Sequence, residues 1–101
     1  MLKPRLALPG EAVVQKGDKG DAMYFISSGA VRVEVEPNPV ILGSGDFFGE
    51  MALLSDQGRT VSVVAEGFCD LLTLYTKDFR TLLDQDPELK ATIEQVAAER
   101  A

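Results

Sequence analysis

One segment of the chain combines residue types that can bind an anion. Gly49 and Glu50 open a short run that can form one turn of helix over residues 50–54, and the unpaired N–H groups at a helix start attract anions. Across a loop, Arg59 can bring a planar charged fork to the same anion, and Thr60 adds a hydroxyl. The Glu50 carboxylate fits this site if the ligand also donates a hydroxyl, such as a sugar 2′-OH. Each residue alone fits an ordinary core or a solvated surface equally well, so only the joint pattern predicts the site.

The composition excludes most kinds of catalytic chemistry. The chain of 101 residues has no histidine and a single cysteine, Cys69. Without histidine there is no imidazole general base, no Ser-His or Cys-His nucleophile pair and no imidazole metal ligand. One cysteine forbids an internal disulfide and a zinc site built on a cysteine pair. We therefore predict a protein that is not an enzyme, with no catalytic residues and no metal.

Charge and hydropathy limit the partners. The net charge of −6 argues against nucleic acid or an anionic membrane surface as the main partner. No stretch approaches the roughly 20 apolar residues that a bilayer crossing needs, and Met1–Arg5 lacks the apolar middle of a signal peptide. We therefore expect a soluble domain with no nucleic acid partner and no direct membrane insertion.

The chain divides into a strand-rich part and a helical part. All nine glycines lie between Gly10 and Gly67, where they punctuate short strand-like runs, and residues 27–30 are predicted to form a tight hairpin. After Leu74 the apolar period becomes helical. Thr76 is predicted to cap one helix, and Asp86 followed by a proline to start another. The fold class is mainly β: a single domain over 1–101, with an antiparallel, jelly-roll-like β-roll over about 3–75, a short anion-binding helix, and helices over about 76–85 and 87–100.

Two runs of the sequence resemble a known family. Phe48–Leu54, the loop after it and Arg59–Val63 are similar to the phosphate-binding cassette of cyclic nucleotide-binding domains. Gly17–Gly29 resembles the glycine-punctuated β-roll of the same family. The similarity covers about residues 5–100 in the expected order. It implies a ligand, cAMP or cGMP, and no other cofactor.

The resemblance also implies a role for each matching cassette residue. Arg59 would pair with the exocyclic phosphate, and Thr60 would donate to it and favour a syn guanine. Glu50 would accept from the ribose 2′-OH. The main chain would approach the sugar-phosphate at Gly49, Met51 and Ala52.

The base contacts implied by the resemblance come from other parts of the chain. Val33, and Val61 or Val63, would line the base. Arg100 resembles the residue with which some bacterial channel domains touch the base, and a solvated cation near a helix C-terminus is the other interpretation. The sequence departs from the family where Gly58 replaces the usual proline before the arginine and Val61 replaces an alanine. These changes affect loop rigidity and the space near the ligand, but neither removes a donor.

We interpret the chain as a non-catalytic ligand sensor in which the helix over 87–100 closes as a lid on binding. The turn over 36–40 resembles bacterial potassium channels, and the opening over 6–11 resembles cation–proton antiporters. We therefore expect a cytoplasmic domain of a bacterial inner-membrane cation channel or transporter, with the transmembrane portion of the same chain as its partner.

Three alternatives remain at this point. The first is a cyclic nucleotide-binding module of a transcription regulator or of a kinase-type regulatory protein. The second is a degenerate β-roll used only for oligomerisation. A cupin-like metal enzyme is the third, and the absence of histidine counts strongly against it.

Overall fold

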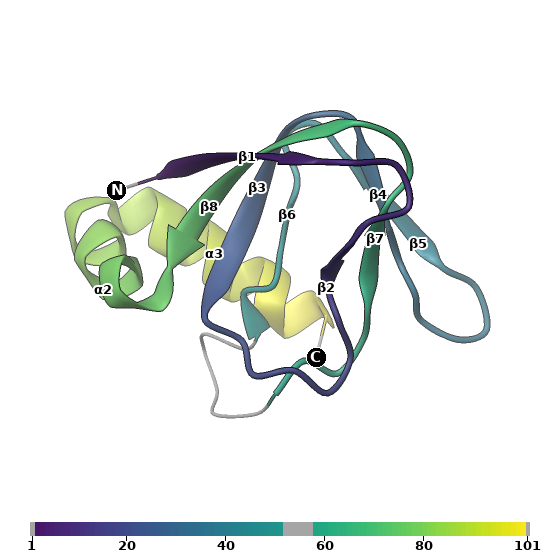
Figure 1. The fold of residues 1–101 in the computed structure, drawn as a ribbon. Coiled ribbons are helices and arrows are strands. Elements are labelled where there is room, and N and C mark those ends of the chain that lie inside the picture. Colours follow the sequence, from purple (N-terminus) through teal and green to yellow (C-terminus); the bar gives the residue numbers. More distant parts are fainter. Residues whose placement is uncertain (1, 52–57, 101) are drawn as a thin grey trace.

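Two antiparallel sheets form a roll in the computed structural model, which describes residues 2–51 and 58–100. Each sheet has four strands, in the orders β1-β8-β3-β6 and β2-β7-β4-β5, and Figure 1 shows the strands curving around a common interior. The predicted antiparallel β-roll is confirmed. The strands are β1 (Lys3–Ala7), β2 (Ala12–Val14), β3 (Ala22–Ser28), β4 (Ala30–Val33), β5 (Val40–Gly43), β6 (Phe47–Phe48), β7 (Val63–Ala65) and β8 (Cys69–Tyr75).

The predicted hairpin at residues 27–30 is wrong. β3 pairs with β6 and β8, whereas β4 pairs with β5 and β7, so the chain changes sheets between them. The change occurs at Gly29, whose φ is +92°. A Cβ at this position would lie 2.6 Å from the Phe68 carbonyl oxygen. Gly29 therefore allows the two sheets to meet closely at a corner of the roll, where a side chain would not fit.

The short strand β6 connects two separate cores. Successive side chains of a strand point to opposite faces, so Phe48 faces the roll interior while Phe47 faces the helices. Phe48 stacks on Tyr24 with ring centroids 5.2 Å apart. The interior consists of small and branched residues from both sheets, which include Ala7, Val14, Ile26, Val31, Val63, Ala65 and Leu71.

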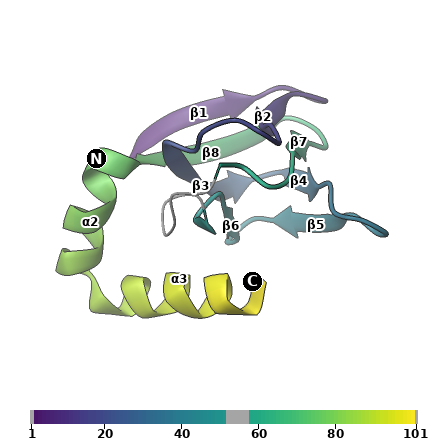
Figure 2. The same cartoon turned by 90° about the horizontal axis from the view of Figure 1, so that it is seen from below.

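The second core lies between the first sheet and two helices, α2 (Thr76–Gln85) and α3 (Pro87–Arg100). Figure 2 shows α2 leading away from β8 and α3 turning back beneath the roll. Ile93 of α3 is fully buried in this core. The other buried members are Met23, Phe47, Leu74, Phe79 and Leu83. None of the helices within residues 2–51 and 58–100 is long and apolar enough to span a membrane.

One of the two predicted helix caps is confirmed. The Leu89 N–H donates to Asp86 Oδ1 at 3.0 Å, which is the predicted cap of α3. The predicted cap at Thr76 is wrong, because Thr76 is already the first residue of α2 and Tyr75 occupies the cap position without a side-chain bond. Instead, the Thr76 N–H donates to the Asp21 carbonyl at 2.9 Å. A backbone acceptor from another part of the chain thus replaces the side-chain cap.

The close contact at Gly29 predicts a large cost for an added methyl group. We expect Gly29→Ala to lower the free energy of unfolding by about 2–4 kcal/mol, because positive φ and overpacking add together. Gly10→Ala is the matched control, since Gly10 has a φ of +80° but nothing within 4 Å of its would-be Cβ. Urea unfolding measures both variants, and an equal loss in the two would contradict the sheet-corner contact.

Candidate functional site

A cavity of about 290 Å³ opens at the end of the roll that α3 approaches. Nine of the ten residues predicted from the sequence line it, and the tenth, Ala52, lies outside the described residues. The nine are Val33, Gly49, Glu50, Met51, Arg59, Thr60, Val61, Val63 and Arg100. Sequence reasoning missed four further lining residues, which are Val14, Leu42, Phe48 and Gly58.

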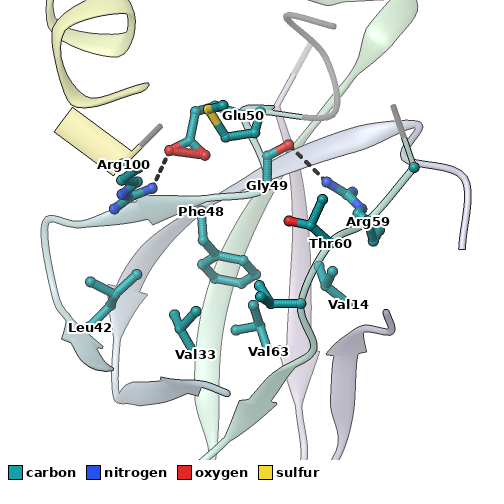
Figure 3. Close-up of a pocket in the computed structure, with 13 residues that line it drawn as sticks. Val14, Val33, Leu42, Phe48, Gly49, Glu50, Arg59, Thr60, Val63 and Arg100 are labelled. Carbon is teal, nitrogen blue, oxygen red and sulfur yellow. Dashed lines mark hydrogen bonds and ion pairs between the residues drawn. The ribbon is translucent and has the colours of Figure 1, made fainter. Parts of the chain in front are cut away.

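The second sheet supplies the apolar wall of the cavity. Val63 of β7 pairs with Val14 of β2 on one side and with Val33 of β4 on the other. These three valines therefore form a row across three strands, and Leu42 of β5 extends the same wall. Figure 3 shows these side chains on one side of the cavity and the charged groups on the other. A ligand with one apolar and one anionic part fits this division.

Arg59 is the buried cation of the charged side. Only 9% of the residue is exposed. Its Nη1 donates to the Gly49 carbonyl at 2.8 Å, and its Nη2 donates to the Ala22 carbonyl. Burial lowers the pKa of the Arg59 guanidinium, and nearby acidic groups such as Asp21 oppose that shift. An arginine stays charged in such a setting, so Arg59 provides a fixed positive charge.

The backbone of Arg59 is held as firmly as its side chain. Its N–H donates to the Asp18 carbonyl at 2.7 Å, and its own carbonyl accepts from the Gly17 N–H at 2.8 Å. A Cβ at Gly58 would lie 3.1 Å from the same Asp18 oxygen. The small residue before Arg59 therefore permits the close approach of the loop between β2 and β3. This pairing positions the arginine before any ligand is present.

Glu50 directly follows Gly49, whose carbonyl accepts from Arg59, and it is 1% exposed. Its Oε1 accepts from Nη1 of Arg100, the last residue of α3. The Arg100 guanidinium also lies over the Phe47 ring, with its Cζ 5.3 Å from the ring centroid. Arg100 thus lines the cavity, as predicted, and it contacts Glu50 and Phe47 there.

The charges of the lining residues suit a monoanion. Two arginines and one glutamate among the described lining residues leave a net charge of +1. A phosphodiester of charge −1 would balance this wall. Within the described part of the chain, no group of three or more His, Cys, Asp or Glu residues is placed to hold a metal ion.

The β-roll and its anion-binding cavity together define a class of protein. The family model for the cyclic nucleotide-binding domain matches residues 4–86. The chain therefore belongs to the cyclic nucleotide-binding domain family. It is a regulatory binding domain and not an enzyme, in agreement with the sequence-based prediction.

Cyclic nucleotide-gated channels are among the proteins to which the chain is similar in sequence. The chain is 44% identical over 99 residues to a cyclic nucleotide-gated potassium channel of Rhizobium etli, covering 98% of this chain and 28% of the channel. It is 36% identical over 100 residues to the potassium/sodium hyperpolarization-activated cyclic nucleotide-gated channel 2 of Mus musculus, covering 98% of this chain and 12% of that channel. The chain thus spans less than a third of the length of these relatives.

The fold is also similar to that of a solved catabolite activator protein. The Thermus thermophilus catabolite activator protein aligns with a TM-score of 0.86 and 31% identity, covering 98% of this chain and 49% of that protein.

The contacts of Arg59 predict a role in the stability of the empty domain. We expect Arg59→Ala to lower the free energy of unfolding by about 1–3 kcal/mol without ligand, because the buried Ala22 carbonyl and the half-buried Gly49 carbonyl each lose a donor. Arg80→Ala, at an exposed position of α2, removes the same charge without such contacts and serves as the control. Thermal or urea unfolding compares them, and equal losses would mean that the Arg59 contacts do not hold the site together.

Proposed function

We propose that this domain binds a cyclic nucleotide, cAMP or cGMP, in the cavity. The observation that carries the proposal is the buried Arg59 fork opposite the Gly49–Glu50 segment, in a cavity whose described lining has a net charge of +1. A guanidinium has five N–H donors. It can therefore bind a phosphate while it keeps backbone contacts such as the one to Gly49.

The remaining lining residues fit the other parts of the nucleotide. Glu50 would accept from the ribose 2′-OH, and Thr60 would donate to the phosphate. The main chain at Gly49, Met51 and Ala52 would lie along the sugar-phosphate. The base would lie against the apolar wall, which consists of Val33, Val61 and Val63 together with Val14 and Leu42.

We further propose that binding regulates a membrane cation channel. The support is the 44% identity to a bacterial potassium channel, together with the position of α3, whose last residue lines the cavity. A ligand that binds one position of α3 better than another shifts the balance between them. The domain would then act on the cytoplasmic side of the membrane, with the transmembrane portion of a longer chain as its partner.

A second candidate is the sensor module of a transcription regulator. The 31% identity to the catabolite activator protein, over 98% of this chain, favours it. The channel relatives are more similar in sequence, so we place the channel first. Both candidates share the cyclic nucleotide as ligand.

Ligand binding predicts a thermal shift. At about 100 times the dissociation constant, cAMP or cGMP should stabilise the fold by about 2.7 kcal/mol. For a domain of this size that raises Tm by about 10 °C or more. Differential scanning fluorimetry with a hydrophobic dye measures the shift, and 5′-AMP, which lacks the ring phosphodiester, is the control. No shift at millimolar cAMP and cGMP would contradict the proposal and favour a β-roll that serves only for oligomerisation.

Removal of the guanidinium should weaken nucleotide binding strongly. Arg59→Ala is expected to weaken nucleotide binding by about 2–5 kcal/mol, since a buried charge then has no partner. Arg59→Lys keeps the charge but not the planar fork, so it should recover part of the loss. Isothermal titration calorimetry, at a temperature where every variant is folded, compares their dissociation constants for the nucleotide. Arg80→Ala is the control. Near-native affinity in Arg59→Ala would place the phosphate elsewhere.

A further inference from the structure

The Glu50–Arg100 ion pair connects the cavity wall to the last turn of α3. A carboxylate that is 1% exposed needs a cation or several donors to remain charged. Arg59, the other arginine of the lining, donates to the Gly49 and Ala22 carbonyls. Arg100 is therefore the cation that the described part of the structure pairs with Glu50.

Two contacts of different kinds hold the Arg100 guanidinium. One is the bond to Glu50 Oε1, and the other is the Phe47 ring, 5.3 Å from Cζ. Phe47 belongs to the core beneath α3, together with Ile93. A planar guanidinium suits a carboxylate and a ring face at once, whereas a lysine ammonium would keep only the charge. The orientation of Glu50 is thus tied to the packing of α3.

We propose that Arg100 is a positioning residue that acts through Glu50 and sets how strongly the site distinguishes ribose from deoxyribose. The proposal rests on the proposed function for its ligand, and it gives Arg100 a role other than contact with the base. A carboxylate held in one orientation accepts a hydroxyl hydrogen at a defined place. A carboxylate without the bond to Arg100 can adopt other orientations, so it no longer accepts a hydroxyl hydrogen at one fixed place. The same pair fastens the end of α3 to the cavity before a ligand arrives.

The two roles of Arg100 make different predictions. If Arg100 touches the base, its removal weakens binding of ribose and 2′-deoxyribose ligands by the same factor. If it acts through Glu50, its removal weakens binding of the ribose ligand more, because only that ligand carries the hydroxyl that Glu50 reads. A thermodynamic cycle that combines removal of the Arg100 side chain with removal of the ligand's 2′-hydroxyl distinguishes the two roles.

The ligand test compares cAMP with 2′-deoxy-cAMP by calorimetry. A hydrogen bond to a charged group predicts that the parent chain prefers the ribose ligand by on the order of tenfold or more. In Arg100→Ala this preference should fall by about fivefold, and Arg100→Lys should recover part of it. Lys90→Gln, which removes a charge from the exposed face of α3, should keep the parent preference. An unchanged preference in Arg100→Ala would overturn the proposal.

Glu50→Gln completes the test. If Arg100 acts through Glu50, the ribose preference of Glu50→Gln is already reduced, and adding Arg100→Ala changes it no further. A further loss of preference in the double variant would show that Arg100 reads the sugar independently of Glu50, which contradicts the proposal.

Hydrogen exchange of the ligand-free domain tests the ion pair without any nucleotide. Arg100→Ala and Glu50→Gln should each speed exchange in the last turn of α3 by about threefold or more, because that turn loses its tie to the cavity, while Lys90→Gln should not. Unchanged exchange rates in both variants would contradict the claim that the Glu50–Arg100 pair holds the last turn of α3 at the cavity. If the parent chain binds no cyclic nucleotide, the proposed function fails. If it binds and Arg100→Ala keeps the full ribose preference, only the present inference fails.

Discussion

A buried guanidinium must be surrounded by acceptors, and this requirement explains how the cavity is built. The carbonyls that receive the Arg59 side chain belong to Ala22, at the start of β3, and to Gly49, directly after β6. Both strands belong to the first sheet, whereas Arg59 itself precedes β7 of the second. Its backbone is bonded to the loop between β2 and β3. One residue thus joins both sheets at the mouth of the roll and presents a fixed positive charge there.

The two arginines of the cavity have different partners, so only one of them has a positive charge that is not paired with a carboxylate within the described residues. Arg59 bonds to backbone carbonyls, which carry no net charge, so its own charge remains available to an anion. Arg100 is paired with the Glu50 carboxylate, so that pair is neutral as a whole. Under the proposed function, the phosphate of the ligand would therefore be drawn toward Arg59, while the neutral pair borders the part of the cavity that α3 reaches. The proposed recognition of the anion and the attachment of the helix would then rest on separate contacts within one cavity.

Local patterns in the sequence predicted the elements and the residues of the proposed anion site, and the family resemblance supplied the other site residues. Non-local pairings account for what both missed. The change from strand to helical periodicity predicted α2 and α3 with their observed bounds. The hairpin at residues 27–30 failed because Gly29 packs on Phe68, which no local pattern indicates. The Thr76 cap failed for the same reason, since its acceptor is the distant Asp21. Val14 and Leu42 line the cavity through strand register, which the sequence shows only after pairing is known. The bond between Glu50 and Arg100 likewise depends on how α3 packs.

The most direct test of the account is a crystal structure of the domain with cAMP bound. The account predicts that the cyclic phosphate lies within hydrogen-bonding distance of the Arg59 guanidinium, with the base against the valine row of β2, β7 and β4. A nucleotide whose phosphate lies away from Arg59, or a cavity occupied by the side chains of the protein itself, would contradict it.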